Sequence, residues 1–223
     1  MSVFILLDMG KTFMQILRKS SEAQMILEFL KMEYQSERFH QKLAGVLAAL
    51  GQTEALLFDA CLDNEMENKR RRTVMGVYRG YGQNQGLFEN FPKDITWSQA
   101  CFTQGDLARL RYIRYDYWDK LSGETSRPAD AARNIRRGLT VFDVPNDGFH
   151  AAAQALARGV RFPPLIFLYT GQSSSLFYLV EGHKRATAYA MYPQAFPGTL
   201  CYAGLCGETA LKRWRSGEEN HSF

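Results

Sequence analysis

Short apolar runs alternate with helical patterns in the second half of the chain. Residues 162–170 (Phe-Pro-Pro-Leu-Ile-Phe-Leu-Tyr-Thr) and 176–180 (Leu-Phe-Tyr-Leu-Val) are rich in aromatic and branched side chains, as buried strands are. Gly171 and the three serines after it supply a turn, so we expect the two runs to form a hairpin. Alanines at alternate positions after Gly182 favour a helix, which places this glycine where a strand gives way to a helix.

The segments around this hairpin show patterns of both kinds. The run Arg111–Trp118 alternates large and charged residues as a half-buried strand does, which places Arg114 and the candidate carboxylate Asp116 on one face. Other predicted elements are strands at 139–144 and 199–203, helices at 129–137 and 149–158, and a short amphipathic end at 211–214.

The first half of the chain follows the helical period. Apolar residues recur at spacings of three and four from Ser21 to Gly51, with a break near Gln35–Ser36, and a second helix is expected at Thr53–Asn64. Trp97–Leu110 is predicted to be helical as well, interrupted by an end and a fresh cap at residues 103–106.

These patterns divide the chain into two expected parts. Residues 1–108 form an α-helical N-terminal region, and residues 109–223 form an α+β domain with a small mixed sheet and helices. The helical region is expected to pack against the α+β domain. An amphipathic helix pair also suits a dimerisation arm, so a homodimer stays open.

Composition narrows the class of protein. With 46% apolar and 22% charged residues, a chain of 223 residues can bury one good core. The net charge of +4 favours an anionic ligand without implying nucleic acid. Four scattered cysteines do not make a disulfide framework, which suits a reducing cytoplasm. Residues 1–8 make a poor signal peptide and no run is long enough to span a membrane, so we expect no membrane partner.

The densest run of charge is Lys69, Arg70, Arg71 and Arg72. Four consecutive cations can contact a nucleic-acid backbone, and two tyrosines that follow, at positions 78 and 81, can stack on bases. The alternative is the solvated face of a helix. The glycines at positions 76, 80, 82 and 86 do not follow a nucleotide-binding spacing and are predicted to be turns.

The start of the helix after Gly182 is the strongest candidate site. The first backbone N–H groups of a helix are unpaired and carry partial positive charge, which makes them an anion site. His183, Lys184 and Arg185 fall in this first turn, where cations are poor partners for the helix dipole. We therefore expect them to serve a negatively charged ligand.

The pattern of a strand, Glu181-Gly182-His183-Lys184-Arg185 and an alanine-rich helix resembles the signature of the ParB/sulfiredoxin-fold superfamily. Chromosome-partitioning proteins, sulfiredoxins and free-serine kinases share this fold. The resemblance covers about residues 110–208 and implies that Gly182 to Arg185 bind nucleotide phosphates. It also assigns a pocket role to Arg127, in a loop after the first strand.

The motif departs from each branch of the superfamily. Sulfiredoxins carry a reactive cysteine directly after the motif glycine, where this chain has His183, so their repair chemistry is not implied. Partitioning proteins carry Gly-Glu-Arg-Arg in place of Gly-His-Lys-Arg. The local motif is most similar to the Asp-Gly-His-His-Arg of free-serine kinases, with Glu181 in place of the aspartate and Lys184 in place of the second histidine.

Two functions follow. The first is an enzyme, a phosphotransferase or nucleotide hydrolase that uses ATP or CTP with Mg²⁺, with Glu181 as metal ligand or base and Asp116 or Glu124 assisting. The second is a nucleotide-sensing or DNA-associated regulatory module in which Lys69–Arg72 contacts an acidic partner, and a nuclease is a lesser variant. For Glu181 and Arg185 the structural alternative is an ion pair within the helix start.

Overall fold

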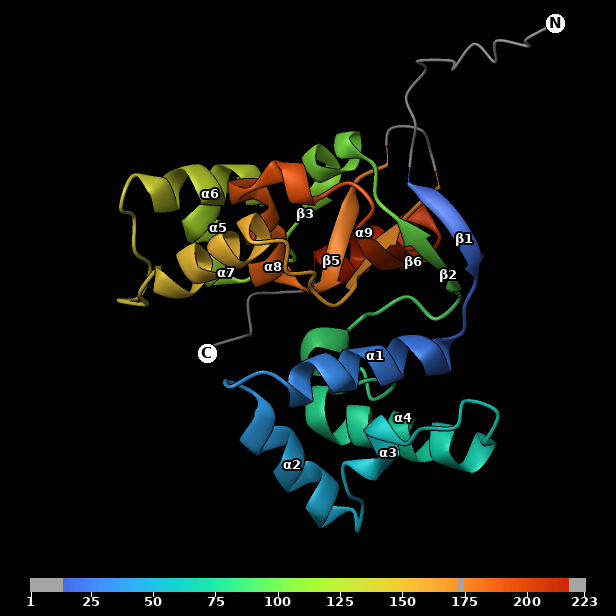
Figure 1. Cartoon of the computed structure of the whole chain (residues 1–223). Coiled ribbons are helices and arrows are strands. Elements are labelled where there is room, and N and C mark those ends of the chain that lie inside the picture. The colour runs from blue at the N-terminus through green and yellow to red at the C-terminus, as the bar shows by residue number, and fades with distance from the viewer. Residues whose placement is uncertain (1–13, 172–174, 217–223) are drawn as a thin grey trace, which may run out of the picture.

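A computed structural model describes residues 14–171 and 175–216 of the chain. Within these residues, six strands form one mixed sheet in the order β1-β2-β6-β4-β5-β3 (Figure 1). The strands are β1 Gln15–Lys19, β2 Thr96–Cys101, β3 Leu110–Arg111, β4 Leu165–Tyr169, β5 Phe177–Glu181 and β6 Leu200–Leu205. Strand β6 is antiparallel to β2 and parallel to β4, and β3 is parallel to β5. The predicted hairpin is confirmed as β4 and β5, which pair antiparallel.

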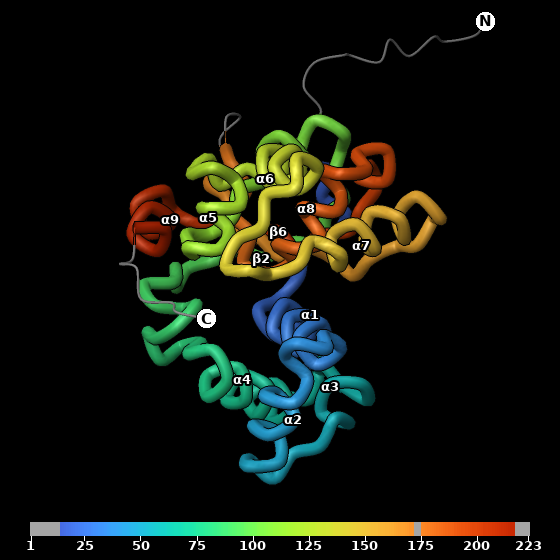
Figure 2. The backbone as a smooth tube through the Cα atoms, turned by 90° about the vertical axis from the view of Figure 1, so that its left-hand side faces the viewer, coloured from blue at the N-terminus to red at the C-terminus, as the bar shows by residue number. Residues whose placement is uncertain are grey.

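Helices lie in two groups. One group lies to one side of the sheet and comprises α1 Glu22–Tyr34, α2 His40–Ala49, α3 Ala55–Phe58 and α4 Glu65–Arg79 (Figures 1 and 2). The other elements are α5 Asp116–Ser122, α6 Pro128–Arg136, α7 Asp147–Ala157, α8 His183–Met191, α9 Glu208–Arg215, and the short 3₁₀ helices η1 Gly86–Phe88, η2 Gln104–Arg109 and η3 Pro193–Ala195.

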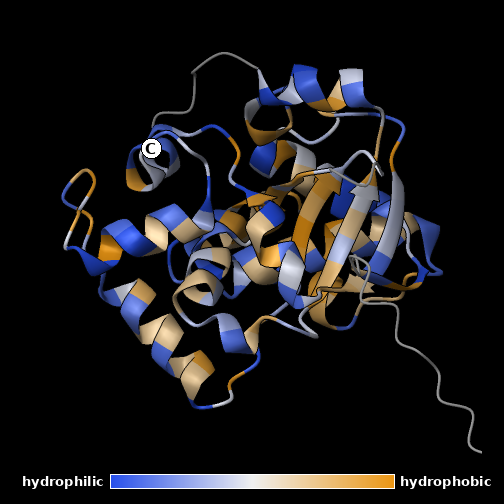
Figure 3. Cartoon of the chain, turned by 90° about the horizontal axis from the view of Figure 1, so that it is seen from above, coloured by the Kyte–Doolittle hydropathy of each residue, from blue (hydrophilic) through white to orange (hydrophobic). Residues whose placement is uncertain are grey.

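Each face of the sheet has its own core, because successive side chains of a strand point to opposite faces. Phe167 and Leu179 belong to the core formed with α5 to α8, whereas Ile166 and Val180 belong to the core formed with α1, α4 and α9. Figure 3 shows the most apolar strands within the sheet and helices of mixed hydropathy beside them. The sheet thus separates two layers of helices.

Several local predictions are confirmed. The break near residues 35–36 separates α1 from α2, and the predicted helices at 129–137 and 149–158 correspond to α6 and α7. The closing strand is β6, and the amphipathic end is α9. The predicted cap is present at η2, where Thr103 and Asp106 bond each other's backbone in a capping box.

The prediction of a helix over Trp97–Leu110 is wrong. Its first part is β2, which pairs with both β1 and β6, and only Gln104–Arg109 is helical, as the 3₁₀ helix η2. Pairing with two strands that are distant in sequence overrides the local pattern here. Strands β1 and β2 lie before residue 108, so the region expected to be helical also contributes to the sheet.

The prediction of a strand over Arg111–Trp118 is also wrong, except at Arg111, which lies in β3. Strand β3 ends at Arg111, and α5 begins at Asp116, so the expected face shared by Arg114 and Asp116 does not form. The alternation of aromatic and charged residues arises from a short helix whose first turn carries Asp116 and Asp119, which suits the helix dipole.

Two further predictions are wrong in part. Residues 139–144 contain one isolated bridge, between Val141 and Val144, with Phe142 and Asp143 at φ of 52° and 56° in the turn. Residues 53–64 contain only the short helix α3. Among the described residues, no helix is long and apolar enough to cross a membrane.

Candidate functional site

Gly182 makes the corner between β5 and α8. Its φ is 103°, in the left-handed region that favours glycine. A Cβ at this position would lie 2.4 Å from Cδ2 of Leu165, so packing against β4 also requires glycine. No side chain caps the first amides of α8, which begins at His183. The predicted helix start is therefore confirmed, with its N–H groups not bonded by a side-chain cap.

Arg185 faces the protein rather than solvent. Its Nη1 donates to the carbonyl oxygens of Pro163 and Pro164, each at 2.9 Å, and its Nη2 lies 2.8 Å from Oε1 of Glu181. The other carboxylate oxygen, Oε2, accepts the N–H of Gly182. Arg185 and Glu181 thus form the helix-start ion pair that the sequence left as one alternative.

Glu181 lies within reach of charges from the helical group α1–α4. Burial raises the pKa of Glu181, the charge of Arg185 opposes this shift, and Glu33 and Arg79 act in opposite directions. Glu33 of α1 forms an ion pair with Arg79, at the end of α4, and accepts a hydrogen bond from the hydroxyl of Tyr78. The charges of the Glu33–Arg79 ion pair therefore act on Glu181 at this corner.

His183 packs beside two aromatic rings that also contact each other. Its ring stacks at 22° on Tyr112, with centroids 5.8 Å apart, and at 22° on Trp118, with centroids 5.4 Å apart. Its Nε2 is enclosed and has no hydrogen-bond partner. Burial lowers the pKa of His183 to about 3, and the charges of Arg185 and Arg79 contribute. The imidazole is therefore neutral at neutral pH.

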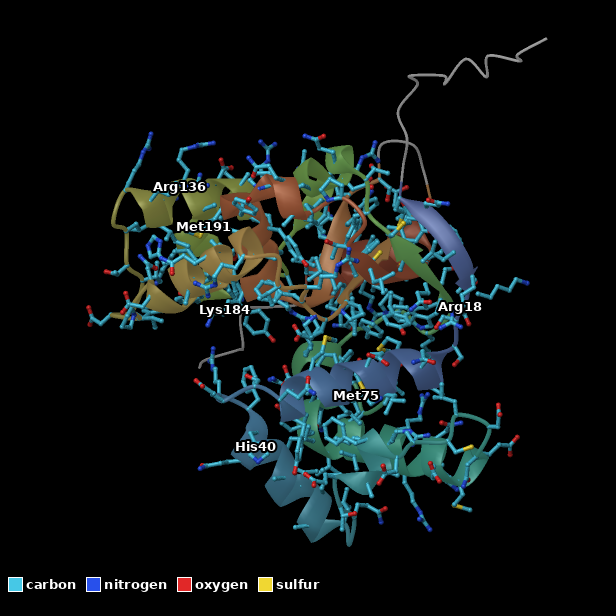
Figure 4. All side chains as sticks on the ribbon, in the orientation of Figure 1. Arg18, His40, Met75, Arg136, Lys184 and Met191 are labelled. Carbon is cyan, nitrogen blue, oxygen red and sulfur yellow. The ribbon has the colours of Figure 1, made fainter. Side chains whose placement is uncertain are left out.

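Lys184 is exposed, and its ammonium reaches the first turn of α7. A Cβ built at Gly148 would lie 2.5 Å from Nζ of Lys184, so the two residues are in close contact. Figure 4 places Lys184 on the side of α8 that faces the helical group, away from Arg136 and Met191. Sequence analysis missed Gly148, since nothing local marks the second residue of a helix as a neighbour of Lys184.

The other two candidate carboxylates belong to a separate group. Asp116 begins α5, and Glu124 follows the end of α5 at φ of 63°. Burial raises the pKa of Asp119, and both carboxylates add to this shift, which places all three near one another. No hydrogen bond or ion pair links Asp116 or Glu124 to Glu181 among the described residues. Nothing in the sequence pattern pointed to Asp119.

The donor set around Glu181 does not fit Mg²⁺. Both of its oxygens are bonded within the protein, to Arg185 and to the N–H of Gly182. Over residues 14–171 and 175–216, no three His, Cys, Asp or Glu side chains are grouped so that they could hold a metal ion.

The basic run at residues 69–72 lies within α4. Arg71 is fully buried and donates to the carbonyls of Leu56 and Cys61, at 2.9 and 3.1 Å, and to Oδ1 of Asn68 at 2.6 Å. Arg72 forms an ion pair with Glu22. Lys69 and Arg70 are exposed.

The residues after this run also differ from expectation. Gly76 is not a turn but lies inside α4, whereas Gly80 ends the helix in the left-handed conformation. Tyr78 and Tyr81 are buried, so their rings are not available for stacking on bases. Each hydroxyl donates to a carboxylate, that of Glu33 for Tyr78 and that of Glu22 for Tyr81.

A shallow hollow of about 630 Å³ lies in the helical group. Tyr34 is one of the residues that line it, and its ring makes edge-to-face contacts with His40 and Phe58, with ring centroids 4.4 and 5.6 Å apart. The hydroxyl of Tyr34 donates to Glu54 at 2.8 Å, which ties α1 to the start of α3. None of the residues of the candidate site at α8 lines this hollow.

The molecule is a mixed α/β protein whose candidate site lies at a strand-to-helix corner. Comparison of the chain with protein-family models, with curated proteins and with solved structures gives no significant match.

Proposed function

We propose that this protein binds the phosphate groups of a nucleotide where the first turns of α7 and α8 meet. The observation that carries the proposal is the position of Lys184. Its backbone lies in the first turn of α8, and its ammonium lies against Gly148 in the first turn of α7. Helix starts carry partial positive charge, so the ammonium of Lys184 lies in an unfavourable place between two of them. A bound anion would stabilise it.

No ion pair within the described residues neutralises Lys184. Asp147 is the acidic residue in the first turn of α7 and supplies a single negative charge. A phosphate group brings more charge and several acceptor oxygens, which suit an ammonium and free backbone N–H groups together.

Further donors lie at the same corner. The first amides of α8 receive no side-chain cap, so they can donate to a phosphate oxygen. Arg185 contributes indirectly, because it fixes Glu181 and the two proline carbonyls behind the corner.

We favour nucleotide binding without catalysis over a phosphotransferase or hydrolase activity. A general base or metal ligand needs a free carboxylate oxygen, and both oxygens of Glu181 are engaged. The charges of Glu33 and Arg79 act on Glu181, which offers a route by which an occupied site can influence the helical group. A nucleotide-sensing role of the kind that the ParB-like motif implies is consistent with both observations.

Calorimetric titration with ATP, CTP and GTP, with and without Mg²⁺, tests the proposal. At least one nucleotide should bind, and a product assay should detect no cleavage. Lys184→Gln should weaken binding by about tenfold, since the loss of one charge-assisted bond is worth about 1.5 kcal/mol. Lys212→Gln, which removes an exposed cation on α9, should bind as the wild type does.

Gly148→Ala provides a sharper variant. The added methyl group displaces the flexible end of Lys184 and leaves the charge of the protein unchanged. Alanine also favours a helix over glycine by up to about 1 kcal/mol, so α7 should stay folded. Weaker nucleotide binding in this variant is expected. Wild-type affinity in both Gly148→Ala and Lys184→Gln, or no nucleotide binding at all, would contradict the proposal.

A further inference from the structure

A group of arginines meets at the edge of the sheet formed by β3. Arg111 is the ladder partner of Tyr178 in the parallel pair β3 and β5. The guanidinium carbon of Arg215, in the last turn of α9, lies 3.7 Å from the centroid of the Tyr178 ring. Arg127 stands at the start of α6. We call Arg111, Arg127 and Arg215 the arginine cluster.

The backbone holds Arg127 beside this edge. The N–H of Tyr112, which follows β3, donates to the carbonyl of Ser126 at 2.8 Å, so the residue before Arg127 runs alongside the end of β3. Burial lowers the pKa of Arg111, and the charges of Arg127 and Arg215 lower it further. Arg127 and Arg215 are therefore each close enough to Arg111 for their charges to act on it.

The arginine cluster has no counter-charge of its own. Within the described part of the chain, none of its members forms an ion pair. Arg111 donates to the backbone carbonyls of Ala108 and Leu110, at 2.8 and 2.7 Å. Asp130 is the carboxylate whose charge acts on Arg111, and it already pairs with Arg133 at 2.8 Å.

The cluster is separate from the α8 corner. Tyr178 packs in the core on the α9 side of the sheet. Tyr112, which stacks on His183, packs in the core on the opposite side. A ligand at one place therefore contacts different residues from a ligand at the other.

We propose that the arginine cluster binds a phosphate group, carried either by a free nucleotide or by the phosphodiester backbone of a nucleic acid. A guanidinium is a planar fork of donors that matches phosphate oxygens, and three forks can share the oxygens of one phosphate. Strand β3, helix α6 and helix α9 each supply one arginine, so the site exists only in the folded chain. Anion binding also relieves the repulsion within the cluster.

Three probes separate the two sources of phosphate: inorganic phosphate, ATP and a fluorescently labelled single-stranded oligonucleotide of mixed sequence. The test variant is Arg111→Gln/Arg127→Gln/Arg215→Gln. The control Arg70→Gln/Arg137→Gln/Arg158→Gln removes the same charge from exposed positions elsewhere. The test variant should lose at least about tenfold in affinity for the probe that binds, since two or more charge-assisted bonds are lost.

The salt dependence identifies the ligand. If the backbone of a nucleic acid is the ligand, the slope of log affinity against log salt should fall by about 0.7 in the test variant, because the cluster contacts one phosphate. If ATP or inorganic phosphate binds and the oligonucleotide binds no better, the phosphate belongs to a small molecule. Lys184→Gln should leave binding at the arginine cluster unchanged. This variant therefore distinguishes failure of the cluster proposal from failure of the proposed phosphate site at α8.

The double variant Arg127→Gln/Arg215→Gln guards against misfolding, because it keeps the backbone bonds of Arg111. It should fold and show an intermediate loss of affinity. The proposal is overturned if no probe binds the wild-type protein at low salt, if the test variant binds as the wild type does, or if the control loses as much.

Discussion

Two groups of arginines in this protein differ in whether their charges are neutralised within the fold. Residues 69–72 are contiguous, yet α4 turns them in different directions: Arg71 is buried among four acceptors and Arg72 pairs with Glu22. The arginine cluster is scattered along the sequence, yet the fold brings it together without a counter-charge. The density of charge in a sequence therefore does not tell which cations are available to a ligand.

Arg71→Ala should show the largest loss of stability, because the buried guanidinium satisfies the carbonyls of Leu56 and Cys61 and the side chains of Glu67 and Asn68. We expect the free energy of unfolding to fall by about 4 kcal/mol. Urea unfolding measures it. Arg70→Ala, its exposed neighbour, should change stability by less than about 0.5 kcal/mol, and equal losses in the two variants would refute the distinction.

Arg185→Ala should cost about 3 kcal/mol at neutral pH, because it leaves the buried carboxylate of Glu181 without its counter-charge. Removing Arg185 raises the pKa of Glu181 further, so the folded protein holds a proton that the unfolded chain releases. The deficit relative to wild type should therefore shrink as the pH falls toward the ordinary value of 4.5.

Urea unfolding at two pH values checks this deficit. The matched control is Arg133→Ala, which removes an exposed ion pair with Asp130 and should lose well under 1 kcal/mol. A deficit in Arg185→Ala that grows at acid pH would contradict the assignment.

His183 should make the protein less stable in acid. Its folded pKa of about 3 lies below the ordinary 6.5, so its contribution is complete above about pH 6.5 and is lost as the pH falls toward 3. At pH 4.5 the loss should be about 2–3 kcal/mol. His183→Phe keeps a stacking ring without titrating, and its stability should fall less between pH 7 and 4.5.

The exposed His150 gives the control for this measurement, since His150→Phe should follow the wild-type pH dependence. If His183→Phe and wild type lose stability in parallel, the enclosed imidazole is not the cause.

Arg72→Gln should show the smallest effect. Its ion pair with Glu22 is exposed on both sides, and such pairs contribute about 0.2–1 kcal/mol. Comparison with Glu22→Gln and the double variant isolates the pair, and high salt should abolish the coupling. A coupling that survives high salt would show that Arg72 belongs with buried Arg71 rather than with the exposed cations.

The sequence predicted the parts of the fold that local pattern controls. The β4–β5 hairpin, α6, α7 and the helix start after Gly182 carry their own turn residues and composition, and each is confirmed. Strand β2 was missed, because its partners β1 and β6 lie far away in sequence. Helix α5 was mistaken for a strand, because aromatic residues that alternate with charges also fit one short helix.

In the candidate site, too, some features were predicted from the sequence and others depend on the fold. The motif residues 181–185 do lie at one corner, as their spacing requires. That Arg185 also bonds the carbonyls of Pro163 and Pro164, and that Gly148 meets Lys184, depends on segments distant in sequence: the residues just before β4 and the first turn of α7. Mg²⁺, nucleotide binding and the cytoplasmic location stay predictions from the sequence.

By itself the sequence determined where strands and helices begin around Gly182, since turn geometry and side-chain periodicity act over a few residues. Tertiary structure alone decided which charged groups are neutralised inside the protein and which remain for a ligand. The reason is physical: a charge is neutralised by whatever lies within a few ångströms in space. For Lys184 and Arg185 the closest groups come from other elements of the fold, as do the charges that act on Arg111.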